Sequence, residues 1–195
     1  LPAASYAARV VDAEGATRYA LAALDTDSVT NPGPEMPGLG EAALRTACAT
    51  GAPVVWMGHH PPSSQGRHHT HEAASEAALR RVALDAVATG CRLVLIAAGH
   101  DHDLQAYGPS CEEAGMPPVV VSGVGARGFR DRGSEHLSPC PADAGAGSVY
   151  EGGARDEGGL AWVTLRSDGS GEIALGTADR SGAWTPLPTV SWGAR

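Results

Sequence analysis

Residues 93–105 read LVLIAAGHDHDLQ, an apolar run followed by a glycine and by two histidines that flank an aspartate. An apolar run of this length that stops at a glycine predicts a buried β-strand. If the chain stays extended beyond Gly99, His100 and His102 point to one face and Asp101 points to the other. Two imidazoles on one face just past a strand end predict a site for one metal ion or for two adjacent ions.

Other classes of protein also use a His-x-His motif, and the residues that follow the motif separate them. A metallo-β-lactamase-like motif needs Asp at 104 and His at 105, whereas this chain has Leu104 and Gln105. A cupin-like motif needs Glu soon after the second His, whereas Ala106 and Tyr107 stand there. Both classes are therefore disfavoured.

A second strand upstream ends in the same way. Residues 53–57 (PVVWM) predict a buried strand, and Gly58-His59-His60 follows it directly. Between the two histidine sites, residues 71–89 predict a helix with Thr70 as its N-cap and Gly90 as its stop. Its apolar stripe consists of Leu79, Val82, Ala83, Ala86 and Val87, and its polar face of Glu76, Arg80, Arg81 and Asp85. Strand, helix and strand in this order predict a parallel β-α-β unit, with the histidines at the carboxyl edge of the sheet.

The remaining segments predict an α/β fold, with mixed β-sheet layers and flanking helices in a single domain of 195 residues. We expect strands at 7–11, 19–25 and 118–122, a helix at 41–50 stopped by Gly51, and a hairpin of 160–165 with 172–175. Residues 1–8 are expected to form an arm, 26–40 a loop, and 126–159 a Gly-rich loop or insertion. The tail with Trp184 and Trp192 is expected to pack across the sheet edge.

Composition excludes several classes of function. The 14 basic residues are all Arg and stand against 22 acidic ones, giving a net charge of −8. The absence of Lys excludes Schiff-base and P-loop chemistry. An acidic chain without a basic cluster argues against binding to nucleic acid or to an anionic membrane. No apolar run is long enough to span a bilayer.

The four cysteines form no C-x-x-C pair, which argues against a zinc knuckle. Cys111 and Cys140 lie in Pro- and Gly-rich loops and could form a disulfide. Cys48 and Cys91 lie near the ends of helical stretches and are expected to be plain core residues. Four cysteines hint at an oxidising compartment.

These motifs together resemble the calcineurin-like metallophosphoesterases, and most closely the purple (tartrate-resistant) acid phosphatase branch. The resemblance rests on VWMGHHP at 55–61, a polar loop ending at His68, GHDHDLQ at 99–105 and VVSG at 120–123 with Gly125. It runs from about residue 19 to the hairpin. It implies an αββα sandwich, a dinuclear centre of Fe, Zn or Mn, and hydrolysis of phosphate esters (phosphomonoesterase activity) by in-line attack of a metal-bound hydroxide.

The resemblance also implies roles for individual histidines. His59 and His100 would ligate the second metal, and His102 the first. His68 would contact the phosphate or protonate the leaving oxygen, with His69 as the alternative. His60 is expected to be supporting or structural, and the 68–71 histidines could also belong to a solvated loop.

Several family motifs are missing from this chain. Gly-Asp occurs nowhere, and the sole Asn, Asn31, lies in Thr-Asn-Pro and cannot be the asparagine of a Gly-Asn-His motif. The chain therefore resembles only the C-terminal half of such an enzyme, and we expect weak metal binding and slow turnover. The implied partners are a phosphate-ester small molecule and the missing N-terminal half, in a secreted or periplasmic location. The rival interpretation is a non-catalytic module with a vestigial or structural His metal site.

Overall fold

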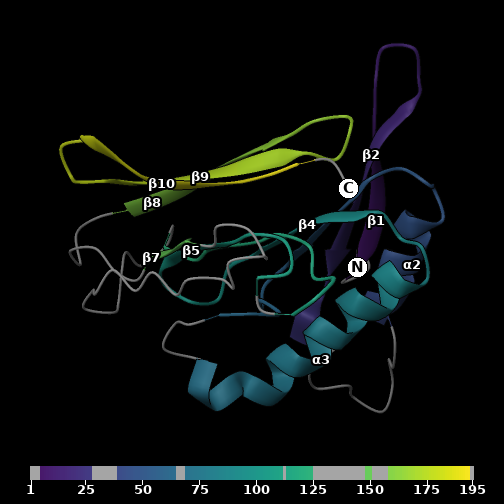
Figure 1. Ribbon diagram of the computed structural model, residues 1–195, viewed down its shortest axis with the longest axis horizontal. Coiled ribbons are helices and arrows are strands. Elements are labelled where there is room, and N and C mark those ends of the chain that lie inside the picture. Colours follow the sequence, from purple (N-terminus) through teal and green to yellow (C-terminus); the bar gives the residue numbers. More distant parts are fainter. Residues whose placement is uncertain are drawn as a thin grey trace.

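The computed structural model describes residues 5–27, 39–64, 69–111, 113–124, 148–150 and 158–193. It is an α/β structure in which two helices cover one face of a seven-stranded mixed sheet and a three-stranded antiparallel sheet covers the other (Figure 1). The large sheet has the order β1-β2-β3-β4-β6-β5-β7 and the small one the order β10-β9-β8. The elements are β1 (Tyr6–Val11), β2 (Thr17–Leu24), α2 (Leu39–Cys48), β3 (Val54–Gly58), α3 (His69–Ala88), β4 (Leu93–Ala98), β5 (Leu104–Tyr107), β6 (Val119–Ser122), β7 (Ser148–Tyr150), β8 (Gly158–Leu165), β9 (Gly171–Ala178) and β10 (Trp184–Trp192).

The predicted β-α-β unit is confirmed. Strands β3 and β4 pair in parallel and α3 connects them. The predicted apolar stripe of α3 faces the sheet, with Leu79 and Ala83 fully buried. Gly90 has φ 91°, a left-handed conformation that ends the helix at little steric cost. The predicted N-cap was wrong, because the helix already begins at His69 and Thr70 lies in its first turn.

A bulge interrupts the pairing of β3 with β4. Val54 lies opposite Leu93, but Val55 lies opposite Leu95, so Val94 is an extra residue in β4. The bulge changes which residues of β4 share a face. Leu93 and Ile96 pack on the helix side of the sheet, whereas Leu95 packs on the other side. Beyond the bulge the two strands run in step toward their histidines.

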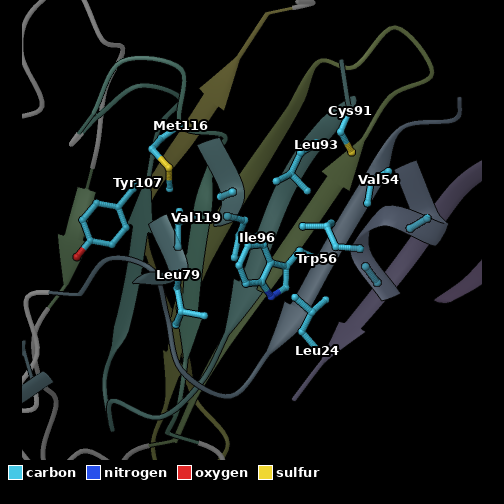
Figure 2. Packing of buried hydrophobic residues seen from close by; sticks show 14 of the residues in the cluster. Leu24, Val54, Trp56, Leu79, Cys91, Leu93, Ile96, Tyr107, Met116 and Val119 are labelled. Carbon is cyan, nitrogen blue, oxygen red and sulfur yellow. The ribbon is translucent and has the colours of Figure 1, made fainter. Parts of the chain in front are cut away.

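Two hydrophobic clusters hold the three layers together. The cluster under the helices contains the indole of Trp56, which is fully buried among side chains such as Leu24, Leu79 and Ile96 (Figure 2). The cluster between the sheets joins Leu95 and Val120 to residues of the small sheet such as Ile173. Strands β3 and β4 both contribute side chains to each cluster, as expected for strands buried on both faces.

A disulfide joins Cys48, at the end of α2, to Cys91, just before β4. The expectation that these two cysteines are plain core residues was therefore wrong. They lie 43 residues apart in sequence, and the folding of α2 beside α3 brings their Cα atoms to 5.0 Å. Cys111 is also disulfide-bonded, and its predicted partner Cys140 lies outside the described residues.

Two further expectations fail at the ends of the chain. The strand predicted at 7–11 is confirmed as β1, but residues 6–8, which were assigned to the arm, belong to it and pair with β2. The C-terminal tail forms β10 and pairs with β9, so it is a full strand of the small sheet. The predicted hairpin around residues 167–170 is confirmed as β8 and β9. No helix in the described segments is both long and apolar enough to cross a membrane.

The turn between β1 and β2 is closed by Asp12. Its carboxylate accepts a 2.7 Å hydrogen bond from the backbone N–H of Ala16 and pairs with Arg18 at 2.7 Å. The backbone hydrogen bond, helped by the Arg18 charge, holds the pKa of Asp12 below its usual value of 3.8.

Candidate metal centre

Three imidazoles meet at the carboxyl ends of β3 and β4. His59, His60 and His100 each offer a nitrogen, and these nitrogens lie within 4.8 Å of one another. His100 Nδ1 and His59 Nε2 lie 3.2 Å apart. His59 is exposed and the other two are half-buried, so the cluster faces solvent on one side. Parallel pairing of two strands that each end in Gly-His produces this meeting point.

His60 is held by the buried hydroxyl of Thr26. The backbone N–H of His60 donates to Thr26 Oγ1 at 2.9 Å, and the same oxygen lies 3.0 Å from His60 Nδ1. With Nδ1 in contact with Thr26, a metal ion would bind His60 through Nε2. A ligating His commonly donates its other ring N–H to a neighbouring acceptor, which fixes the ring orientation. Thr26 therefore fits the role of an orienting partner for His60.

The segment after β4 does not stay extended, contrary to the expectation that placed His100 and His102 on one face. His100 has φ 68°, a left-handed conformation that is uncommon outside glycine. This turns His100 toward His59 and buries the side chain of Asp101, which is 1 % exposed. His102 is not part of the imidazole group that the described residues form. The predicted geometry of the His-x-His motif was wrong for this reason.

The three imidazoles suit one transition-metal ion. Metal–nitrogen bonds of about 2.0–2.1 Å place two nitrogens of a tetrahedral site roughly 3.3 Å apart, and His59 Nε2 and His100 Nδ1 are already 3.2 Å apart. Small side-chain rotations of the exposed His59 and the half-buried His60 would complete the set. Neutral imidazoles favour Zn, Fe, Cu or Ni over Mg or Ca, which prefer oxygen. Three protein ligands leave a coordination position open.

Carboxylates lie beneath the histidines but do not join them. Among the described residues, no Asp or Glu belongs to the group that could hold a metal. Asp101 is buried and accepts a short hydrogen bond from Ser64 Oγ. Asp103 is fully buried and accepts one from Gln105 Nε2 at 2.8 Å. The geometry therefore fits a single ion better than the dinuclear centre that the resemblance implies.

Helix α3 anchors the loop that carries His59 and His60. Glu76, predicted on the polar face of the helix, is instead buried and lies 3.8 Å from Arg80. Arg80 donates to the backbone carbonyl of Pro62 at 3.1 Å. His68, the predicted catalytic residue, lies outside the described residues. The side chain of His69, its alternative, is not described either.

Sequence reasoning gave His60 a supporting role and did not single out Thr26. The adjacent pair His59-His60 was a signal, since two consecutive imidazoles at a strand end double the local supply of ligands. Nothing in the sequence marked Thr26, which lies 34 residues from His60 and reaches it only through the pairing of β2 with β3.

Comparison with known proteins shows a similarity in fold. No family model matches the sequence, and no curated protein matches it. A solved structure described as "GAP50 the anchor in the inner membrane complex of Plasmodium" is similar, with a TM-score of 0.53 and 13 % sequence identity. The similarity covers 100 % of this chain and 56 % of that one, so the chain spans little more than half of the neighbour's length. At this identity the similarity shows the fold alone.

Proposed function

We propose that the protein is a metal-dependent hydrolase of phosphate esters, with His59, His60 and His100 as ligands of one metal ion. The observation that carries the proposal is the convergence of three imidazole nitrogens within 4.8 Å at adjacent strand ends. The resemblance of the two Gly-His motifs to calcineurin-like metallophosphoesterases supports the reaction class. On this proposal the two packed sheets are the C-terminal part of a metallophosphoesterase sandwich.

Each ligand has a distinct structural support. His59 and His100 are brought together by parallel pairing of β3 with β4. Thr26 orients His60 through two contacts with one oxygen. A bound ion would supply a Lewis acid that polarises a phosphoryl oxygen and lowers the pKa of water. The exposed side of the cluster, at His59, is where a phosphate ester could approach.

The proposal departs from the purple acid phosphatase pattern in two ways. The resemblance implies only His59 and His100 of this chain as ligands of this ion. We propose His60, which we expected to have a supporting role, as its third ligand. An additional ion at His102 and general-acid chemistry at His68 remain proposals for a complete enzyme, in which another segment supplies the bridging carboxylate. Without such a carboxylate, two cations a few Å apart repel strongly.

Metal stoichiometry tests the ligand set. The protein, purified without chelator, is titrated with Co²⁺ and Zn²⁺ while absorbance and elemental content are recorded. We expect one ion per chain, and a loss of affinity of at least about tenfold in His59→Ala, His60→Ala and His100→Ala. His102→Ala is the matched control and should leave the ion at His59, His60 and His100 in place. Loss at His102→Ala with none at His60→Ala would refute the three-imidazole site.

A non-catalytic metal-binding module is the second candidate. The similar solved structure is that of a protein described as an anchor, and the described residues of this chain offer no bridging carboxylate beside the imidazoles. Hydrolysis of p-nitrophenyl phosphate by the metal-loaded protein separates the two candidates. Turnover that disappears in His100→Ala supports the hydrolase. Tight metal binding with no turnover above free metal ions supports the module.

A further inference from the structure

The three histidines lie on two loops that are joined by a buried polar contact. The first loop follows β3 and runs from His59 to Ser64, and the second follows β4 and runs from Gly99 to Asp103. Ser64 Oγ in the first loop donates to the Asp101 carboxylate in the second. Both side chains are only 1 % exposed. This contact spans 37 residues of sequence and lies beneath the imidazoles rather than among them.

The contact continues into a network on β5. Gln105 Nε2 donates to Ser64 Oγ at 3.0 Å and to Asp103 Oδ1 at 2.8 Å. Tyr107 donates its hydroxyl hydrogen to Gln105 Oε1. Buried polar groups are costly unless they are hydrogen-bonded, so a connected network of this kind favours one arrangement of its members. The first loop is thereby fastened to β5 in the sheet.

Backbone contacts hold the second loop in the same place. The N–H of Gly99 donates to the carbonyl of His59 at 3.0 Å. Gly123 packs so closely on the loop that a Cβ at position 123 would lie 1.7 Å from the carbonyl oxygen of Asp101. With Asp101 fixed on one side and Gly99 on the other, His100 is held in its left-handed conformation.

We propose that Ser64 and Asp101 are positioning residues that set the distance between the two histidine loops. The hydrogen bond between them fixes the loops where His59 Nε2 and His100 Nδ1 lie 3.2 Å apart. Neither residue belongs to the group of imidazoles that could hold the metal. The predicted effect on metal affinity rests on the function proposed above. The predicted effect on the spacing of the two loops does not, because it can be measured without metal.

The chain provides a matched control in the neighbouring serine. Ser63 is 2 % exposed, as buried as Ser64, but its Oγ has no hydrogen-bond partner within the described structure. Ser63→Ala and Ser64→Ala therefore remove the same atom from two equally buried positions. Only Ser64→Ala removes the link between the loops.

The test compares Ser64→Ala and Asp101→Ala with Ser63→Ala by two readouts. In metal-free protein, hydrogen exchange of the Gly99 amide should accelerate by about tenfold or more in Ser64→Ala. The Ile96 amide, bonded at 2.9 Å to the Pro118 carbonyl just before the neighbouring strand β6, should not change. In the titration with Co²⁺, affinity should fall by about tenfold to 100-fold and the visible spectrum should shift, as expected when a group that orients a ligand is lost.

The outcomes separate this proposal from the function on which it draws. If Ser64→Ala and Asp101→Ala match Ser63→Ala within about twofold in Gly99 exchange, the positioning role is refuted. If Ser64→Ala does not fold, Asp101→Ala, which removes the acceptor oxygens of the contact, decides between these results. If the wild-type protein binds no Co²⁺ while Gly99 exchange still responds to Ser64→Ala, the proposed function fails and the coupling of the loops stands.

Discussion

The Cys48–Cys91 disulfide should make a large contribution to stability. It closes a loop with a sequence separation of 43. In the chain-entropy model, a loop of that length costs the unfolded state about 4 kcal/mol at 25 °C. We therefore expect Cys48→Ala/Cys91→Ala to lower the free energy of unfolding by about 4 kcal/mol. For a protein of this size, the corresponding fall in Tm is on the order of 8–16 °C.

Urea unfolding measures this loss. The indole of Trp56 is fully buried and its fluorescence reports the core. A Cys48→Ser/Cys91→Ser variant controls for the small change in side-chain packing. A loss below about 1 kcal/mol with an unchanged m value would refute the entropic reasoning. The disulfide lies at the start of β3 and β4, whereas the histidines lie at the opposite end of these strands. The variant without the disulfide should therefore bind Co²⁺ with unchanged affinity.

Three further predictions concern single residues. Gly123→Ala should lower the free energy of unfolding by at least about 3 kcal/mol, because the backbone of Asp101 occupies the space that a Cβ would need. Gly99→Ala is the control: its Cβ would meet nothing nearer than 4.0 Å, so it should lower the free energy of unfolding by less than about 1 kcal/mol. Equal losses for the two variants in urea unfolding would contradict this prediction. Leu79→Ala should cost about 3–5 kcal/mol by the same measurement, since the side chain is fully buried under α3, and a cost below about 1 kcal/mol would mean that the helix is loosely packed. The pKa of Asp12 is lowered in the folded protein, so its contribution to the stability of the β1–β2 hairpin is present above pH 3.8 and is lost as the pH falls through the folded pKa. The NMR signal of the Ala16 amide should therefore titrate with a midpoint below pH 3.8 in the wild-type protein and should not titrate in Asp12→Asn. A midpoint above pH 3.8 would mean that the pKa of Asp12 is raised by folding and would contradict the prediction.

Strong local periodicity made the β-α-β unit predictable. The apolar runs of β3 and β4 and the stripe of α3 each point to one element and one buried face. Strand β5 was missed because its sequence, LQAY, holds the polar residue Gln105, which is buried while hydrogen-bonded to Asp103 and to Ser64, 41 residues away. Strand β10 contains Pro186 and Pro188, which argue against a strand. It forms nevertheless, because it lies at the edge of its sheet and its register shifts between Pro186 and Thr189.

The candidate site was predictable in its location and less so in its membership. Gly-His at two strand ends placed His59 and His100 together, as the structure does. In the structure His60, and not the predicted His102, joins the cluster. This follows from the left-handed conformation of His100 and from the contact of Thr26 with His60, and neither produces a periodic pattern in the sequence. The Cys48–Cys91 pairing was equally out of reach, since four cysteines allow three connectivities and spacing does not choose among them.

The bulge in β4 gives the chain a tolerance to changes in length. Val94 is the extra residue, and removing it would leave Leu93 opposite Val54 and Leu95 opposite Val55, as they already are. Side chains would then alternate regularly along the strand, and His100 would keep its place. Loss of a residue after the bulge, such as Ala97, would instead rotate the end of the strand and carry His100 away from His59. Single-residue deletions between Cys91 and Leu95 should therefore leave the histidine cluster intact. Single-residue deletions between Leu95 and His100 should disrupt it.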